Sequence, residues 1–351
     1  MIDPPQKSQR FALVDALRGI AAMWVVVFHV FAGERLTKLE VMLPNWTAWV
    51  VHRGYLGVTV FFVLSGFVIA HSLQRQSADA SSVGWFMIRR SARLDPPYWA
   101  SLVLTIVIMR AGIPSFGVLL AHVFYLQDLL RLTPLSPIYW TLCLEIQLYL
   151  MFALLLAIAH RFRSDSTDRR SLLIIFTGAA LLAAAFPLGL VHEATLPAGL
   201  FLPRWYTFLL GAFACWAIDG TIPRSTFYLY AAALGAGAVH MGDVDAVVAV
   251  LTSALLLEAG RTGKLRSWLN WRPLQFLGRT SYSLYLVHSA AIGVTLGVLH
   301  RLTPDTASWE FVWLLVALVS SGIAAWMFWR LIERPCIILS RRFRPSTSPA
   351  A

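Results

Sequence analysis

The sequence predicts an all-α protein, a polytopic bundle of about ten transmembrane helices with both termini in the cytoplasm. Of its 351 residues, 58% are hydrophobic and only 13% are charged, whereas a soluble domain usually carries about 25% charged residues. The apolar residues also gather in runs close to the length of a membrane span. In such a protein the net charge of +11 indicates basic cytoplasmic loops rather than a nucleic-acid partner.

Ten apolar segments are the predicted spans. A helix needs roughly 20 residues to cross the hydrocarbon core; the third segment is shorter, and the seventh and eighth are divided only by HMGDVD. A further segment, 115–130, is too interrupted to span and is predicted to be an interfacial or re-entrant helix. The predicted spans are 11–33, 54–73, 96–111, 138–159, 171–191, 198–218, 226–241, 243–260, 276–299 and 309–332.

The basic residues support this count. With the N-terminus inside, Lys and Arg favour the predicted cytoplasmic segments by roughly three to one, and the excess alternates loop by loop, as orientation by positive charge requires. Losing one span would reverse the side of every later loop. Because the first apolar run is long, contains charge and lacks a small-residue cleavage site, we expect it to be a retained helix rather than a signal peptide.

The domain organisation is predicted to be simple. We expect one transmembrane domain over residues 1–340 and a basic, disordered tail over 341–351. The three cysteines, Cys143, Cys215 and Cys336, show neither a CxxC motif nor a metal-binding spacing. We therefore expect no disulfide framework and no metal site.

The first span contains two ionisable side chains, Arg18 and His29, within DALRGIAAMWVVVFHV (15–30). Their spacing places them within about 20° of one helix face and about 16 Å apart along the axis. Ionisable groups in a span are costly unless they face the bundle interior or a wet cavity, so they indicate a functional site. The alternative is that Arg18 pairs with Asp15 and reaches the headgroups, while His29 hydrogen-bonds to a neighbouring helix.

A cluster of arginines precedes the third span, in FMIRRSARLDPPYW (86–99). Arg90 and Arg93 are three residues apart and would share one face of a helix. Two guanidinium groups so placed suit bidentate binding of phosphate. An ordinary positive-inside cluster, formed with Arg89, is the alternative.

Glu145 lies in the apolar segment YWTLCLEIQLYL (139–150). A buried carboxylate stays charged only when a cation faces it, and His29 or Arg18 on another helix is a plausible partner. In the functional interpretation Glu145 orients His29 or stabilises its cation. A polar contact between helices is the alternative.

Two later segments give weaker signals. GRTSYSLYLVH (278–288) carries hydroxyl groups that most often serve helix packing in membranes, while His288 is a candidate for a polar site. IERPC (332–336) is predicted to anchor and end the last span, because the residue before Pro335 is disfavoured in a helix.

Taken together and in this order, these segments resemble the membrane acyltransferase family 3, the integral-membrane O-acyltransferases of bacterial surface glycans. Any one of the motifs would be weak evidence, but the resemblance covers nearly the whole chain. The matching stretches are LVDALRGIAAMWVVVFH, GYLGVTVFFVLSGFVIA, RRSARLDPPYW, WTLCLEIQLYL and SYSLYLVH. One departure is Asp95, where the family commonly has an apolar or aromatic residue, and this acid weakens the case for Arg93 alone as a phosphate ligand.

The resemblance implies a multi-pass enzyme of the bacterial inner membrane. It would take an acyl group, most often acetyl, from cytoplasmic acyl-CoA. The acceptor would be a hydroxyl of a cell-surface or secreted carbohydrate of the cell envelope, for example an exopolysaccharide or a lipopolysaccharide. Some family members carry an extracytoplasmic domain, so a separate acyl-transfer partner is a further expectation.

The predicted site has three parts. His29 would act as general base or transient acyl carrier, with Glu145 orienting it and Arg18 stabilising charge. Arg90, Arg93 and Arg18 would hold the donor phosphates, and acyl-CoA is the expected donor, without a metal. The candidates for acceptor binding are Trp140, Tyr149 and His288.

Two other classes of protein remain as alternatives. Intramembrane Arg, His and Glu also suit a transporter or permease that relays protons, although the sequence shows no inverted repeat. A membrane scaffold without enzymatic activity would tolerate His29→Ala.

Overall fold

The computed structural model describes residues 10–33, 35–74, 80–109, 113–162 and 169–343, and within these ranges all regular structure is helical. The all-α prediction is therefore confirmed. Residues 344–351 of the predicted tail lie outside the described residues. The helices are α1 (Ala12–Phe31), α2 (Thr37–Met42), α3 (Asn45–His52), α4 (Gly57–Gln74), α5 (Ala80–Met109), α6 (Phe116–Val123), α7 (Trp140–Arg161), α8 (Arg170–Ala184), α9 (Trp205–Ile218), α10 (Arg224–Met241), α11 (Val244–Arg261), α12 (Arg272–Leu302), α13 (Ala307–Phe328) and α14 (Arg334–Ser340).

Each of the ten predicted spans overlaps a helix. Five helical stretches of the described chain are long and apolar enough to cross a membrane: Ala12–Phe31, Gly54–Leu73, Trp140–Arg161, Arg272–Leu302 and Ala307–Ser340. The number of ten spans and the cytoplasmic placement of both termini stay predictions. In the segment 115–130, only the short helix α6 forms, followed by turns.

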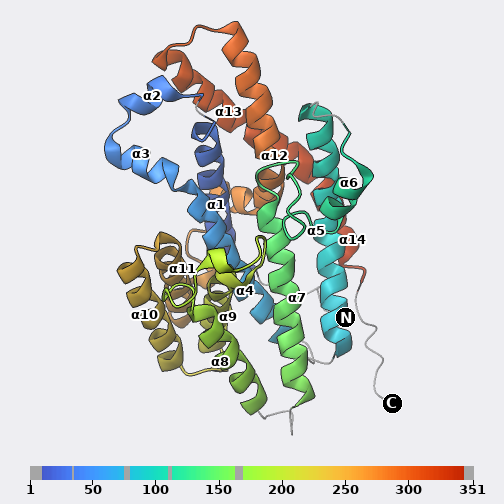
Figure 1. Cartoon of the computed structure of the whole chain (residues 1–351), viewed down its shortest axis with the longest axis vertical. Helices are drawn as coiled ribbons and strands as arrows, with labels where there is room; N and C mark the ends of the chain where they lie inside the picture. The colour runs from blue at the N-terminus through green and yellow to red at the C-terminus, as the bar shows by residue number, and fades with distance from the viewer. Residues whose placement is uncertain (1–9, 34, 75–79, 110–112, 163–168, 344–351) are drawn as a thin grey trace, which may run out of the picture.

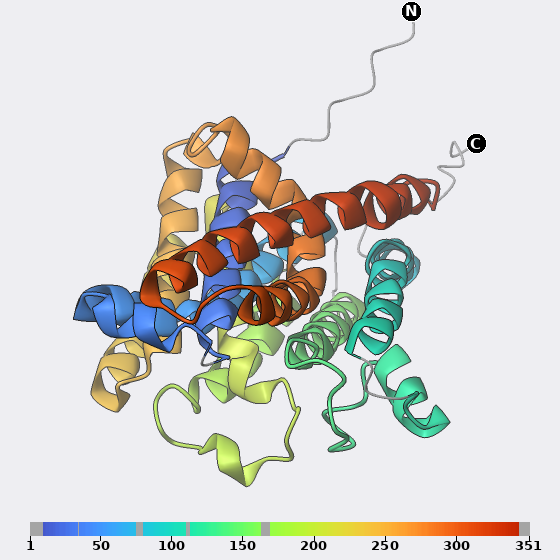
Figure 2. The ribbon, with the colours of Figure 1, turned by 90° about the horizontal axis from the view of Figure 1, so that it is seen from above.

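Helices α1, α4 and α12 lie at the centre of the bundle (Figures 1 and 2). Helices α8 to α11 gather on one side of this centre, and α5, α6 and α14 lie on the other. In α9 every residue from Trp205 to Ala217 is buried, as expected of a helix that is apolar all round. Helices α2 and α3 cover one end of the bundle, beside the turn between α12 and α13 (Figure 1).

Glycines set how closely the central helices approach. A Cβ on Gly278 of α12 would lie 2.0 Å from the carbonyl oxygen of Asp15 in α1, and one on Gly19 would lie 2.8 Å from the amide nitrogen of Gly278. Gly66 of α4 and Gly211 of α9 make an equally close crossing. Small residues allow such backbone contact between membrane helices. The first crossing fixes α1 and α12 side by side, which determines what Arg18 and His29 face.

Prolines lie inside helical segments at two places in the chain. Helix α5 runs through Pro96 and Pro97, so the arginines of the RRSAR motif belong to the same helix as the third predicted span. At the other end of the chain, a π-turn (Trp329–Glu333) links α13 to α14 and the helical path continues through Pro335. The prediction that the last helix ends at Pro335 was wrong. A wider π-turn accommodates an interruption of the regular ladder, and such turns are frequent at functional sites.

Candidate active site

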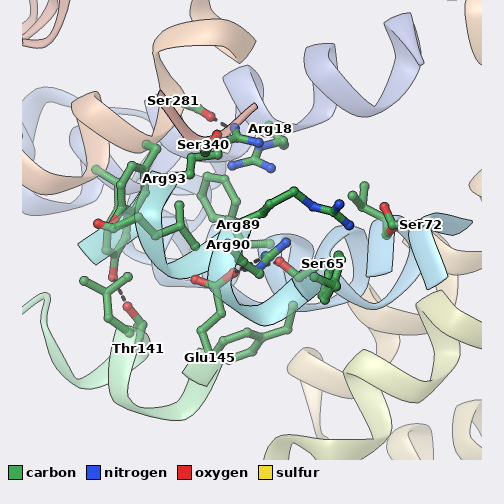
Figure 3. A pocket seen from close by; sticks show the side chains of 18 of the residues that line it. Arg18, Ser65, Ser72, Arg89, Arg90, Arg93, Thr141, Glu145, Ser281 and Ser340 are labelled. Carbon is green, nitrogen blue, oxygen red and sulfur yellow. Dashed lines mark hydrogen bonds and ion pairs between the residues drawn. The ribbon is translucent and has the colours of Figure 1, made fainter. Parts of the chain in front are cut away.

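A cavity of about 430 Å³ lies between α1, α4, α5, α7 and α12, and arginines dominate its lining. Figure 3 shows Arg18 and Ser281 at one end of this cavity and Thr141 and Glu145 at the other. We call it the arginine cavity. Its basic side chains are Arg18, Arg89, Arg90, Arg93 and Arg341, and Glu145 is the one carboxylate among its described lining residues.

Arg90 is held by a polar cluster on one wall of the arginine cavity. Its guanidinium lies 3.5 Å from the Glu145 carboxylate and 3.7 Å from the centre of the Tyr149 ring, and it also donates to the Tyr149 hydroxyl. Ser65 donates to Glu145 at 2.9 Å and accepts from Tyr149 at 3.3 Å. The cluster balances the charge of Arg90 within the protein. Arg90 is therefore less suited to bind a phosphate together with Arg93 than the spacing of the two arginines predicts.

The predicted contact between Glu145 and His29 is wrong. The carboxylate faces Arg90 and Ser65 in the arginine cavity, whereas His29 lies in a different cavity described below. A guanidinium one helix away offers a carboxylate both charge and hydrogen bonds, which an imidazole bonded to its own helix does not. Tyr149, a predicted acceptor ligand, is 1% exposed and packs beneath Arg90.

Arg18 and Arg93 face a second carboxylate that the sequence argument did not place at the site. Glu333, on the π-turn, is 1% exposed and accepts a hydrogen bond from Ser283 at 2.6 Å; its charge acts on both arginines. Arg18 donates to Ser281 at 3.4 Å. The ion pair of Arg18 with Asp15, which was the alternative to a functional role, is not found among the described residues.

Asp95, the departure from the family pattern, is directed away from Arg93. Ser91 and Tyr125 both donate to its carboxylate, Tyr125 at 3.0 Å. The Nε of Arg93 is buried without a hydrogen-bond partner within the described part of the chain. Arg93 also lines the arginine cavity, so its guanidinium stays a candidate phosphate ligand.

A larger cavity of about 940 Å³ lies at the C-terminal end of α1, next to Gly33 and Arg35, and is lined by His29. We call it the histidine cavity. Trp140 lines it with 39% of its surface exposed, as expected for a residue that contacts a bound molecule. Its other polar or aromatic lining residues include Arg35, Tyr55, Tyr285, Ser289 and Arg301.

His29 is positioned by a second histidine. Its Nδ1 lies 2.9 Å from the carbonyl oxygen of Val25 and 3.4 Å from Nε2 of His288. His288 is fully buried, and its own Nδ1 contacts the carbonyl oxygens of Leu284 and Tyr285 at 3.1 and 2.8 Å. Carbonyl oxygens only accept, so both rings carry their proton on Nδ1. The Nε2 of His29 is then left with its lone pair available.

Tyr285 separates the two cavities. It lines both of them, as does Val58. The Tyr285 hydroxyl lies 2.5 Å from Oγ1 of Thr141 and donates to the carbonyl oxygen of Ile138 at 3.0 Å. The ring is thus held at the place where the arginine cavity and the histidine cavity meet. From the sequence, Tyr285 was assigned to helix packing. The spacing of residues in a sequence does not show that two cavities meet at one ring.

The family assignment agrees with this geometry. The model of the acyltransferase domain family matches residues 11–330. This chain belongs to that family. Several of its apolar helices are long enough to cross a membrane.

Relatives of known name are similar along most of the chain. Peptidoglycan O-acetyltransferase OatA of Listeria monocytogenes is 24% identical over 92% of this chain and 55% of the relative. Acyltransferase MdmB of Streptomyces mycarofaciens is 26% identical over 98% and 96%, and the exopolysaccharide production protein ExoZ of Rhizobium meliloti is 28% identical over 83% and 92%. The chain spans about half the length of OatA. No solved structure matches the chain.

Proposed function

We propose that this acyltransferase moves an acetyl group from acyl-CoA, bound in the arginine cavity, to a hydroxyl of a carbohydrate bound in the histidine cavity. The donor would approach from the cytoplasm and the product would appear at the outer face of the bacterial inner membrane. Relatives named for O-acetylation of peptidoglycan and for exopolysaccharide production support a cell-envelope carbohydrate as acceptor.

One observation carries the proposal: two cavities of different chemistry meet at a single tyrosine. The arginine cavity offers guanidinium groups, which suit the phosphates of CoA. The histidine cavity offers an imidazole with a free Nε2 and an exposed indole, which suit a sugar hydroxyl. A thioester that reaches Tyr285 from the arginine side lies next to the cavity that contains His29.

The reaction needs a base and a leaving group. Nε2 of His29 takes the proton from the acceptor hydroxyl while the hydroxyl oxygen attacks the carbonyl carbon of the thioester. The carbon–sulfur bond then breaks, and the CoA thiolate leaves on the arginine side, where Arg18 and Arg93 offset its charge. His288 accepts from His29 Nδ1 and stabilises the ring as it becomes a cation.

The test measures acyl transfer in membranes that contain the wild type, His29→Ala, Arg93→Ala or His192→Ala. His192 is exposed and lines neither cavity, so it is the matched control. Labelled acetyl-CoA is supplied and label is followed into the carbohydrate fraction. We expect His29→Ala to lower transfer by about 10²- to 10⁴-fold, Arg93→Ala to raise the KM for the donor, and His192→Ala to match the wild type.

Other outcomes would redirect the assignment. Normal transfer by His29→Ala returns the histidine pair to a packing role. No transfer by the wild type, combined with uptake of labelled sugar into vesicles, favours the transporter alternative. Transfer that appears only when a second protein is added identifies a separate extracytoplasmic partner.

A further inference from the structure

A second basic cavity adjoins the arginine cavity, and Tyr285 is not among its lining residues. Its volume is about 420 Å³, and it shares Arg18, Val68, Arg93 and Arg341 with the arginine cavity. We call it the mouth cavity. Its arginines are Arg10, Arg18, Arg93, Arg279, Arg334 and Arg341.

The charge of the mouth cavity is poorly balanced. Asp15 is the one carboxylate among its described lining residues. No ion pair of Arg279, Arg334 or Arg341 is found in the described part of the chain, although Arg334 lies over the ring of Trp329 at 5.8 Å. This differs from the wall of the arginine cavity, where Glu145 faces Arg90 at 3.5 Å. Glu333 acts on Arg18 and Arg93, so the unbalanced set is Arg279, Arg334 and Arg341. This set would bind an anion of more than one charge.

Three elements bring these arginines together. Arg279 lies in α12, beside the crossing at Gly278; Arg334 begins α14; and Arg341 directly follows α14. The π-turn that keeps the helical path going through Pro335 is what places α14 beside α5 and the cavity. Guanidinium groups from different elements can approach one phosphate from several sides, each by a bidentate contact.

We propose that the mouth cavity binds the 3′-phosphate of the CoA nucleotide, an inference that rests on the proposed function. The nucleotide would then lie at the mouth, and the pantetheine arm would pass Arg93 toward Tyr285. Arg93 and Arg18 line both cavities and would contact the donor where the two cavities join. In this arrangement, donor recognition depends more on Arg279, Arg334 and Arg341 than on the pair of Arg90 and Arg93.

The experiment compares two nucleotides that differ only in the 3′-phosphate. Full-length protein in nanodiscs of phosphatidylcholine is titrated with CoA and with 3′-dephospho-CoA by calorimetry. The variants are Arg334→Gln and Arg279→Gln, and the matched control is Arg342→Gln, an exposed arginine that lines none of the three cavities. Size-exclusion profiles establish that each variant is folded.

For the wild type we expect 3′-dephospho-CoA to bind about 10- to 100-fold more weakly than CoA, as loss of a charge-assisted contact predicts. Arg334→Gln and Arg279→Gln should weaken CoA binding by about tenfold each and leave 3′-dephospho-CoA unchanged. Arg342→Gln should match the wild type with both nucleotides.

Equal affinity of the wild type for the two nucleotides would overturn the inference while leaving an acyl-CoA donor in place. A phosphate could also come from an anionic lipid headgroup. Equal affinities together with phospholipid that copurifies with the wild type, but not with Arg334→Gln, would assign the mouth cavity to a lipid instead. If neither nucleotide binds, the proposed donor itself fails.

Discussion

The arginine cavity and the histidine cavity are built on opposite principles. In the arginine cavity, carboxylates stand beside the cations: Glu145 faces Arg90, and Glu333 acts on Arg18 and Arg93. In the histidine cavity, the two imidazoles contact each other and backbone carbonyls of their own helices. The first arrangement holds permanent charge in a bundle interior. The second keeps a lone pair directed at the cavity until a proton is transferred.

The largest effect on stability is expected where charge is balanced. Glu145→Ala leaves the guanidinium of Arg90 without its carboxylate, and removing one partner of a buried pair costs about 3–5 kcal/mol. Each side chain is about a fifth exposed to the cavity, so we expect about 3 kcal/mol. The free energy of unfolding is measured by SDS titration in mixed micelles.

A surface pair supplies the control for this prediction. Glu258 and Arg261 form an exposed ion pair at 2.7 Å, and Glu258→Ala should lower the free energy of unfolding far less than Glu145→Ala does. The double variant Arg90→Met/Glu145→Leu should recover most of the lost stability, because it leaves no unpaired charge. Equal costs for Glu145→Ala and Glu258→Ala would show that the arginine cavity is wet enough to solvate Arg90, and the contrast between the two cavities would weaken.

Substitutions in the pair of His29 and His288 should change kcat more than they change the free energy of unfolding or the affinity for the donor. His288→Phe fills the same space but removes the acceptor for His29 Nδ1, and we expect kcat to fall by about 10- to 100-fold. The KM for acetyl-CoA should change by less than about twofold, because His288 does not line the arginine cavity. Steady-state transfer in membranes measures both constants.

A conservative variant separates positioning from packing. His288→Gln carries an amide oxygen that can accept from His29 Nδ1, so it should restore part of the kcat lost in His288→Phe. A merely structural role would give no such recovery. If both variants match the wild type, His29 is oriented by the carbonyl oxygen of Val25 alone.

These two cavities also show what a sequence can and cannot predict here. Composition and apolar runs predict the helix bundle, because burial in lipid imposes length and hydrophobicity on every span. The 11-residue spacing of Arg18 and His29 predicts one shared helix face, but it does not predict that Arg18 lines one cavity and His29 another. The partner of Glu145 could not be predicted, because it depends on how α4, α5 and α7 pack against one another.

For other residues of the site, the sequence pattern indicated a different role or none. The segment with Glu333 and Pro335 was predicted to be a helix end. The π-turn that directs Glu333 inward follows no simple sequence spacing from which it could be predicted. Ser65 lay within the matched LSGF stretch without an evident role, and its contact with Glu145 appears only in three dimensions. The sequence predicts His288 as a candidate for a polar site, and its contact with His29 gives it a specific role there.

The wall between the cavities provides a third test. Tyr285→Ala removes the ring that lines both and widens the opening between them, so more water from the histidine cavity would reach the thioester and hydrolyse it to acetate and free CoA. We expect hydrolysis of acetyl-CoA without acceptor to rise about tenfold, on the order of 1.4 kcal/mol in the barrier. Release of the CoA thiol is measured with a chromogenic disulfide.

Tyr285→Phe is the matched variant for this wall. It keeps the ring but loses the hydroxyl contacts with Thr141 and Ile138, so hydrolysis should rise less than in Tyr285→Ala. Unchanged hydrolysis in a folded Tyr285→Ala protein would mean that the cavities are separated by backbone and Val58 rather than by the ring.

The smallest effect is expected at Ser281, on the Arg18 end of the arginine cavity. The hydrogen bond from Arg18 to Ser281 is long, at 3.4 Å, and Ser281 also donates to the carbonyl oxygen of Gly278 within its own helix. Ser281→Ala removes a single weak constraint, worth about 1 kcal/mol at most. We expect the KM for acetyl-CoA to rise by no more than about fivefold, with kcat unchanged. A large fall in kcat with an unchanged KM would mean instead that Arg18 stabilises the transition state, because losing an interaction made only there lowers kcat without changing donor binding. The two constants, measured in the same membranes as the His288 variants, thus decide whether Arg18 belongs functionally with the donor phosphates or with the chemistry at Tyr285.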